Sequence, residues 1–300
     1  MNNYLGEFAA LATSLFFTAT STQFTLAGRQ VGSIVVNRTR LVLALIFLSL
    51  AHWLLRIPLP VDIGSTRWLW LGISGIVGLV IGDTFLFQAF VWIGPRLAML
   101  LMSLSPILAT IVAWLFLSEK LSPMEIIGIL LTVAGIAWVI LERNGTTGHG
   151  AANPNYLQGL LFGFGAAICQ ALGLIFAKKG LASDFPPLSG TLIRMLVAAS
   201  VLWILTLFRR QALETYRQLN NHRQAVLLLL GGSFTGPFIG VTLSLFAVQQ
   251  TEVGVASTLM ALPPLFLLPV GHFIFNERLG LRAIAGTLIA VLGVAILFLV

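Results

Sequence analysis

Ionisable residues inside long apolar stretches are the ones most able to do chemistry in this sequence. Asp83 lies within the apolar run 67–90, while Arg38, Arg40 and Arg194 lie near the starts of two other runs. A charged group in hydrocarbon costs at least about 2.5 kcal/mol on insertion scales, so it usually faces a polar cavity or an opposite charge. We therefore predict that Asp83 either binds or couples a solute, or pairs with one of these arginines.

The three arginines allow two interpretations. Arg38 and Arg194 lie near the starts of their runs, where a long side chain can extend to the membrane interface and anchor the helix. Alternatively, Arg38 or Arg40 reaches the centre and holds a solute carboxylate through two parallel hydrogen bonds. The second interpretation favours amino acids or other organic anions as solutes.

Uncharged polar residues in the apolar runs form a second group of candidates. Glutamine amides both donate and accept hydrogen bonds, so they can line a path for a polar solute. A histidine inside a membrane can relay protons. The candidates of these two kinds are Gln23, Gln88, Gln170, Gln249 and His272.

Prolines near the middle of two apolar runs form the third group, namely Pro106 and the pair Pro263 and Pro264. A proline inside a helix leaves the carbonyl four residues earlier without its usual donor, which bends the helix. We expect a kink at each position. The freed carbonyls either contact the solute or have no role beyond packing.

The elements that must hold these residues are membrane-spanning helices. A helix of about 20 apolar residues crosses the hydrocarbon core of a bilayer, and such runs follow one another along the chain. The sequence therefore predicts an all-α polytopic membrane protein with ten transmembrane helices. Their expected ranges are 4–27, 33–55, 67–90, 93–117, 123–141, 156–178, 187–208, 224–248, 252–275 and 280–300.

The two halves of the chain repeat one another at an offset of 158 residues. Gly82 aligns with Gly240 and Pro106 with Pro264, while Arg38 aligns with Arg194 after a two-residue shift. Five spans in each repeat make the second copy enter the membrane upside down, so the repeats are inverted. We assign residues 1–142 to the first repeat, 143–155 to a linker and 156–300 to the second repeat.

Composition excludes several other classes of protein. Hydrophobic residues make up 58% of the chain and charged residues 9%, against about 25% charged in soluble domains. The net charge of +7 comes from basic residues scattered along short loops, which argues against nucleic-acid binding and for anchoring to lipid head groups. The single cysteine, Cys169, rules out an intramolecular disulfide and a cysteine-based metal site. We expect no cofactor.

Several motifs resemble those of one transporter family. They are GLVIGDTFLFQAF at 78–90, LLMSLSP at 100–106 and WLFLSEKL at 114–121, with LMALPP at 259–264 and IFNERL at 274–279 in the second half. The chain resembles the EamA family of the drug/metabolite transporter superfamily. The resemblance implies ten helices, a central solute cavity and transport of small metabolites, often export of amino acids or related compounds.

The energy source for transport stays open. The chain also resembles, more distantly, the small multidrug-resistance proteins, whose first helix carries an essential glutamate. Here that register falls near Ala12 or Thr13, and Glu7 is the only acid of the first helix. Asp83, Glu7 and His272 are the candidates for proton coupling, and exchange against a counter-solute fits the sequence equally well.

Inverted repeats let two similar bundles rock about a site near the membrane midplane. The sequence therefore predicts a secondary carrier for small metabolites, an exporter for which a monomer suffices, in the inner cell membrane. The family resemblance favours cytoplasmic termini, although the loop charges favour the opposite side. The alternatives are a channel or lipid scramblase and, with weaker support, an intramembrane serine protease, because residues 72–75 read GISG.

Overall fold

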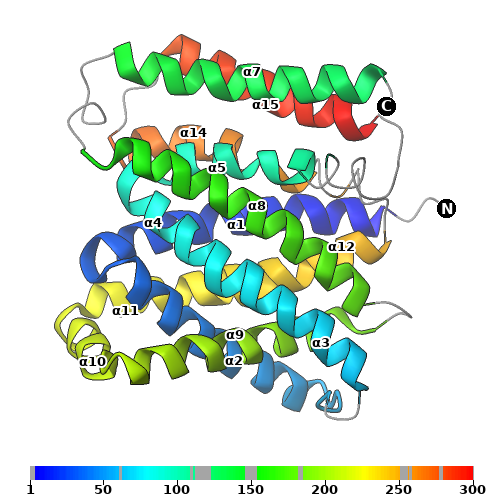
Figure 1. The fold of residues 1–300 in the computed structure, drawn as a ribbon, viewed down its shortest axis with the longest axis vertical. Helices are drawn as coiled ribbons and strands as arrows, with labels where there is room; N and C mark the ends of the chain where they lie inside the picture. Colours follow the sequence, from blue (N-terminus) through cyan, green and yellow to red (C-terminus); the bar gives the residue numbers. More distant parts are fainter. Residues whose placement is uncertain are drawn as a thin grey trace.

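The computed structural model describes residues 4–60, 63–108, 111, 123–145, 154–181, 185–250, 256, 259–276 and 280–299. Every regular element within these ranges is a helix, and most of the helices run side by side across the molecule (Figure 1). The helices of the first half are α1 (Leu5–Val31), α2 (Ser33–Leu54), α3 (Ser65–Ser74), the π-helix η1 (Gly75–Gly82), α4 (Asp83–Ile93), α5 (Pro95–Met102) and α7 (Pro123–Gly145).

The second half repeats this order of elements and adds one short helix. Its helices are α8 (Tyr156–Gly180), α9 (Pro187–Phe208), α10 (Ala212–Asn221), α11 (Arg223–Ser233), the π-helix η2 (Phe234–Gly240), α12 (Val241–Gln250), α14 (Pro263–Phe273) and α15 (Leu281–Leu299). Helix α10, between the second and third spans of this half, was not predicted. The motif 114–121 and parts of the predicted fourth, ninth and tenth spans lie outside the described residues.

Five of the described helices are long and apolar enough to cross a membrane, and three further apolar helices are shorter. The five long ones cover Ser33–Leu54, Ser65–Ile93, Tyr156–Gly180, Pro187–Phe208 and Arg223–Ala247, and the short ones cover Pro95–Leu108, Ile126–Val139 and Leu281–Ile296. The prediction of an all-α polytopic membrane fold is confirmed.

Helix α1 is long enough to span but carries many hydroxyl groups on its buried face. The hydroxyls of Thr13 and Thr18 donate hydrogen bonds to the carbonyls of Ala9 and Ser14, four residues earlier, each at 2.8 Å. The opposite face exposes large apolar side chains, with Phe8 69% exposed. A helix that faces lipid on one side and other helices on the other can bury such hydroxyls, because they bond its own backbone.

Equivalent spans of the two halves pack against each other. Helix α2 contacts α9, α5 contacts α14, and α7 contacts α15 (Figure 1). The first span of each half instead packs on the third span of the other half: α1 contacts α11, η2 and α12, while α8 contacts α3, η1 and α4. This reciprocal pairing is the arrangement expected of two inverted repeats that share one core.

The third span of each half contains a π-helix at the equivalent position. Gly78 and Gly82 of η1 align with Gly236 and Gly240 of η2 at the offset of 158 residues. The missing side chain of Gly82 lets η1 approach α8 closely, since a Cβ on Gly82 would lie only 2.9 Å from Cys169 Cβ in α8. π-helical turns are rare and occur often at functional sites. Neither π-helix was predicted.

The fourth span of each half is interrupted rather than kinked. Helix α5 ends at Met102 and a turn follows at Ser103, and the equivalent turn at Ala261 precedes α14, which begins at Pro263. A helix cannot use proline nitrogen as a donor, so a break just before a proline leaves fewer carbonyls unpaired than an unbroken helix would. The predicted continuous helix 93–117 is therefore wrong at residue 103.

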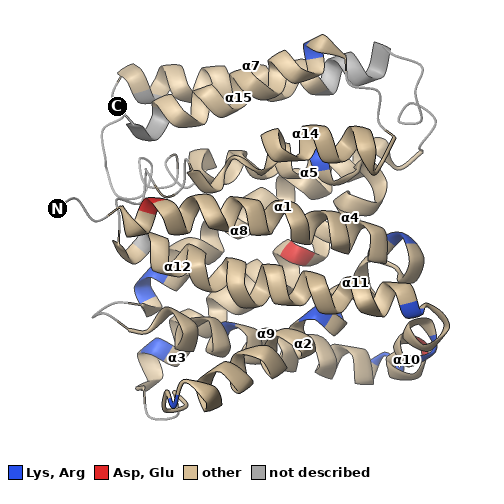
Figure 2. Cartoon of the chain, turned by 180° about the vertical axis from the view of Figure 1, so that it is seen from behind, with Lys and Arg blue, Asp and Glu red and all other residues tan. Residues whose placement is uncertain are grey.

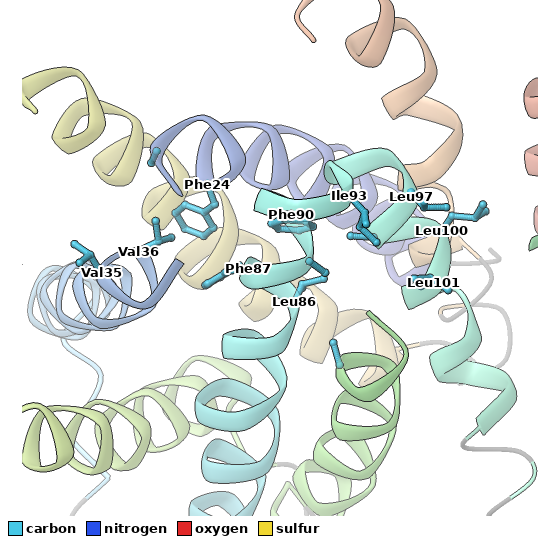
Figure 3. Packing of buried hydrophobic residues seen from close by; sticks show 14 of the residues in the cluster. Phe24, Val35, Val36, Leu86, Phe87, Phe90, Ile93, Leu97, Leu100 and Leu101 are labelled. Atoms are coloured by element: carbon cyan, nitrogen blue, oxygen red, sulfur yellow. The ribbon is translucent and has the colours of Figure 1, made fainter. Parts of the chain in front are cut away.

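Glycines and one apolar cluster fix the geometry around α4. Gly32 and Gly94 have positive φ angles of 85° and 81°, and they end α1 and α4. Within these two helices, the aromatic rings of Phe24 in α1 and Phe87 in α4 pack edge to face, with their centroids 5.2 Å apart (Figure 3). This cluster holds α4 in a fixed orientation, which in turn positions Asp83 at its start.

Candidate functional site

A buried ion pair between α2 and α4 is the centre of the candidate site. The guanidinium of Arg40 binds the carboxylate of Asp83, and the two side chains are only 4% and 8% exposed. Arg40 Nη2 also donates to the Leu79 carbonyl at 3.3 Å, and Arg40 Nε donates to Asn37 Oδ1 at 3.0 Å. Of the three arginines that sequence analysis offered as partners of Asp83, the structure selects Arg40.

The second half of the chain completes this centre. Gln170 of α8 donates from Nε2 to Asp83 Oδ1 at 2.8 Å. Arg194 of α9 lies beside Gly78, since a Cβ there would be 3.5 Å from Arg194 Nη2 and 3.8 Å from Gln170 Oε1. We call Arg40, Asp83, Gln170 and Arg194 the charged centre; it draws two residues from each half.

The π-helix η1 provides backbone acceptors to the charged centre. A carbonyl oxygen has two lone pairs, so a backbone carbonyl within a helix can accept from a side chain as well as from the backbone. The Leu79 carbonyl accepts from Asn37 Nδ2 at 3.2 Å as well as from Arg40, and the Gly78 carbonyl accepts from Gln170 at 3.5 Å. The carbonyls of the π-helix thus accept hydrogen bonds from the buried polar and charged side chains in place of water.

Most other basic residues of the described chain lie toward the ends of the helices (Figure 2). The charged centre differs from these residues because it lies within the bundle. The ring of Phe87, whose centroid lies 4.9 Å from Arg40 Cζ, covers one side of this ion pair. An apolar and aromatic cover strengthens the attraction between the two charges, because it keeps water away from them.

Arg38 occupies a different environment near the end of the molecule. Its Nη1 donates to Thr215 Oγ1 at 3.1 Å and its Nη2 donates to Gln211 Oε1 at 2.6 Å, which ties α2 to α10. A cavity of about 330 Å³ lies there, lined by Arg38, Gln88 and Glu214 among others. Although Arg38 and Arg194 align in the repeat, the described residues include a helix such as α10 only in the second half, so their surroundings differ.

The contacts of Arg38 predict that Arg38→Gln loosens α10. Hydrogen bonds to a charged group are each worth about 1.5–3 kcal/mol, so their loss raises the population of locally open α10. We expect trypsin to cleave after Arg217 at least about tenfold faster in this variant. Mass spectrometry of the fragments measures that rate. The matched change Arg282→Gln, at an exposed position on α15, is expected to leave it unchanged; equal rates in both variants would contradict the role of Arg38.

The remaining predicted residues lie outside the charged centre. Gln23 accepts a hydrogen bond from Thr235 of η2 at 3.3 Å, and Gln249 donates to the Phe185 carbonyl at 3.0 Å. Gln88 accepts from Ser33 beside the cavity near α10. His272 is exposed and lies edge-on to Phe273.

The prolines lie apart from the charged centre as well. Pro263 and Pro264 are buried at the start of α14. Pro106 follows the turn at Ser103. The structure gives these prolines a place at helix breaks, and their contact with a solute stays a hypothesis.

One member of the network, Asn37, was not among the predicted site residues. Its amide donates to Thr84 Oγ1 at 2.9 Å and its carbonyl oxygen accepts from Arg40, so it links the ion pair to the start of α4. The signal was present, because Asn37 precedes Arg40 by three residues and therefore shares a helix face with it.

The fold and the charged centre define a multi-pass α-helical membrane protein with a polar centre between two repeats. The profile of the EamA-like transporter family matches residues 4–141 and 157–299. The chain belongs to the EamA-like transporter family, and it is a membrane transporter.

Relatives and solved structures agree with this class. An uncharacterized transporter of Archaeoglobus fulgidus is 24% identical over 74% of each chain. The uncharacterized transporter YyaM of Bacillus subtilis is 27% identical over 48% of this chain and 45% of its own. A protein of known crystal structure covers 96% of each chain with a TM-score of 0.59 and 16% identity, a likeness that concerns the fold alone.

Proposed function

We propose that this transporter is a secondary carrier that moves small organic solutes by alternating access, with the charged centre as its binding and coupling site. The observation that supports this most is that the centre draws Arg40 and Asp83 from one half and Gln170 and Arg194 from the other. Rocking of one half against the other would change the distances within the centre and open it to one side at a time.

We assign the two moving units to residues 1–142 and 156–300, joined by the linker 143–155. Helix α7 continues to Gly145, so the start of the proposed linker is still helical. Helix α1 packs on the third span of the second half and α8 on that of the first, so in the proposed movement each unit stays in contact with the first helix of the other.

The family resemblance and the excess of arginine in the centre support amino acids or related organic solutes as cargo, carried outward across the inner cell membrane with both termini in the cytoplasm. If transport is coupled to protons, Asp83 is the best placed of the three acid or base candidates. Glu7 lies in the first turn of α1 and His272 is exposed, so neither belongs to the charged centre.

The alternative functions receive less support. A channel or a lipid scramblase needs a continuous polar path, whereas the charged centre is enclosed by Phe87 and by the contacts of η1 with α8 and α9. The serine of the GISG sequence, Ser74, is fully buried and donates its hydroxyl hydrogen bond to the Gly173 carbonyl at 2.6 Å. That hydroxyl joins two helices.

Uptake into proteoliposomes tests the proposed function. We expect one or more members of a labelled panel of amino acids and small carboxylates to enter at a rate that saturates with concentration. A rate that rises linearly with the gradient would instead indicate a channel, and movement of labelled lipid between leaflets would indicate a scramblase. Empty liposomes reconstituted in parallel give the background.

A further inference from the structure

Arg194 differs from the other arginines inside the bundle because its guanidinium has no hydrogen-bond acceptor among the described residues. The residue is 5% exposed, and its Nε is buried without a partner. Arg40 by contrast binds Asp83, and Arg38 donates to Gln211 and Thr215. A buried guanidinium without an acceptor is costly, so its presence points to an acceptor that arrives from outside.

The charges of the centre point to an anion. Two guanidinium groups and one carboxylate give a formal charge of +1, and the single carboxylate, that of Asp83, already accepts from Arg40 and Gln170. The charge of Asp83 acts on Arg194 without a hydrogen bond between them. One further negative charge at Arg194 would make the centre neutral.

The backbone of η1 beside the guanidinium of Arg194 carries no side chain that covers it. Gly78 has no side chain there, and a Cβ at that position would already be in contact with Arg194 Nη2 at 3.5 Å and with the Cα of Gly173 at 3.8 Å. Two glycines thus face each other next to the guanidinium. A planar guanidinium presents paired N–H groups that match the two oxygens of a carboxylate.

We propose that Arg194 binds the carboxylate of the transported solute, which makes small monocarboxylates, amino acids included, the substrate class. This inference rests on the proposed function and deepens it. It assigns the ion pair of Arg40 and Asp83 to the protein's own structure and coupling, and it assigns Arg194 to the solute.

Thermal unfolding of the purified protein with four related ligands tests this assignment at constant ionic strength. Leucine carries a carboxylate and an ammonium group, isocaproate only the carboxylate, leucinamide only the ammonium group, and isocaproamide neither. We expect leucine and isocaproate to raise the melting temperature in a saturable way, because a ligand that binds the folded state stabilises it. The two amides are expected to have no effect.

Variants of Arg194 separate binding from a structural role. Arg194→Gln is expected to weaken the response to isocaproate by at least about tenfold, since the charge-assisted pair is lost. Without ligand this variant is expected to melt no lower than the native protein, because it removes an unpaired buried charge. Arg194→Lys keeps the charge but loses the paired donors. Its response to isocaproate is expected to lie between those of the native protein and Arg194→Gln. Arg282→Gln serves as the matched control and should respond like the native protein.

Several results would overturn the assignment. They are equal stabilisation by the amides, an unchanged response in Arg194→Gln, or equal stabilisation by chloride or sulfate. The four-ligand comparison on the native protein, together with Arg194→Lys, decides the matter even if Arg194→Gln does not fold. Saturable uptake without any carboxylate preference would refute this assignment and leave the carrier function intact. Carboxylate binding at Arg194 without any uptake would refute the carrier function instead.

Discussion

Asp83→Asn is expected to lower the rate of solute transport at least tenfold and to destabilise the protein. The carboxylate of Asp83 is the only negative charge in the charged centre, where it binds Arg40 and accepts from Gln170. Removing one partner of a buried ion pair leaves the other charge uncompensated, which costs about 3–5 kcal/mol. Counterflow in proteoliposomes measures the transport, and thermal unfolding in detergent measures the stability.

A double variant separates these two effects. Replacing a buried ion pair by apolar residues of similar size is often neutral or stabilising, so Arg40→Met with Asp83→Leu is expected to recover most of the lost melting temperature. Transport is expected to stay absent, because Arg194 remains but the ion pair proposed to couple solute binding to movement is gone. If the double variant transports normally, the ion pair has no part in the mechanism and Asp83 is purely structural.

Gly75→Ala is the second change for which a large effect is expected. A Cβ at this position would lie 2.5 Å from the carbonyl oxygen of Arg194 and 3.2 Å from its carbonyl carbon. Both atoms belong to the backbone of α9, so the clash is relieved only if η1 and α9 separate. Overpacking of this kind costs about 1–3 kcal/mol. It also displaces Arg194 from the charged centre, and we expect transport to fall about tenfold.

Gly72, in α3 of the same span, provides a matched control. A Cβ at Gly72 would lie 3.7 Å from the methyl groups of Val197, which is an ordinary contact distance. Alanine also favours helix over glycine by up to about 1 kcal/mol. Gly72→Ala should therefore melt at or above the native temperature and transport normally. If Gly75→Ala behaves in the same way, the close approach of η1 to α9 is not required for transport.

The sequence was enough to predict the fold because membrane spans depend on length and hydropathy, which are local properties. It also predicted most of the ends of the helices. Helix α1 runs four residues beyond its predicted end, to Val31, because the glycine that stops it is Gly32 with its positive φ. Helix α10 was missed because its ten residues carry charges and polar groups that resemble a loop.

The charged centre was only partly predictable, because it depends on how helices rotate against one another. Arg38 and Arg40 are two residues apart and so point to nearly opposite sides of α2. The sequence therefore named both as partners of Asp83 without deciding between them. Packing of α2 on α4 and α9 turns Arg40 toward Asp83 and Arg38 toward α10.

One of the two interpretations of Arg194, the interfacial anchor, disagrees with the structure for a related reason. Its position near the start of its run suggested an anchor at the membrane interface, but α9 buries it next to η1. That burial follows from the close approach of Gly75 to the α9 backbone, a contact between segments more than a hundred residues apart. The hydropathy of one segment does not indicate which distant segment it contacts.

Counterflow across proteoliposomes tests the central claim of alternating access most directly. Vesicles loaded with an unlabelled solute are diluted into a trace of the same labelled solute, and the label inside is followed over time. A carrier whose charged centre faces one side at a time is predicted to accumulate label transiently above its outside concentration, and Asp83→Asn is predicted to abolish this overshoot. Simple equilibration of the label without any overshoot, in native protein that takes up the solute, would contradict the account.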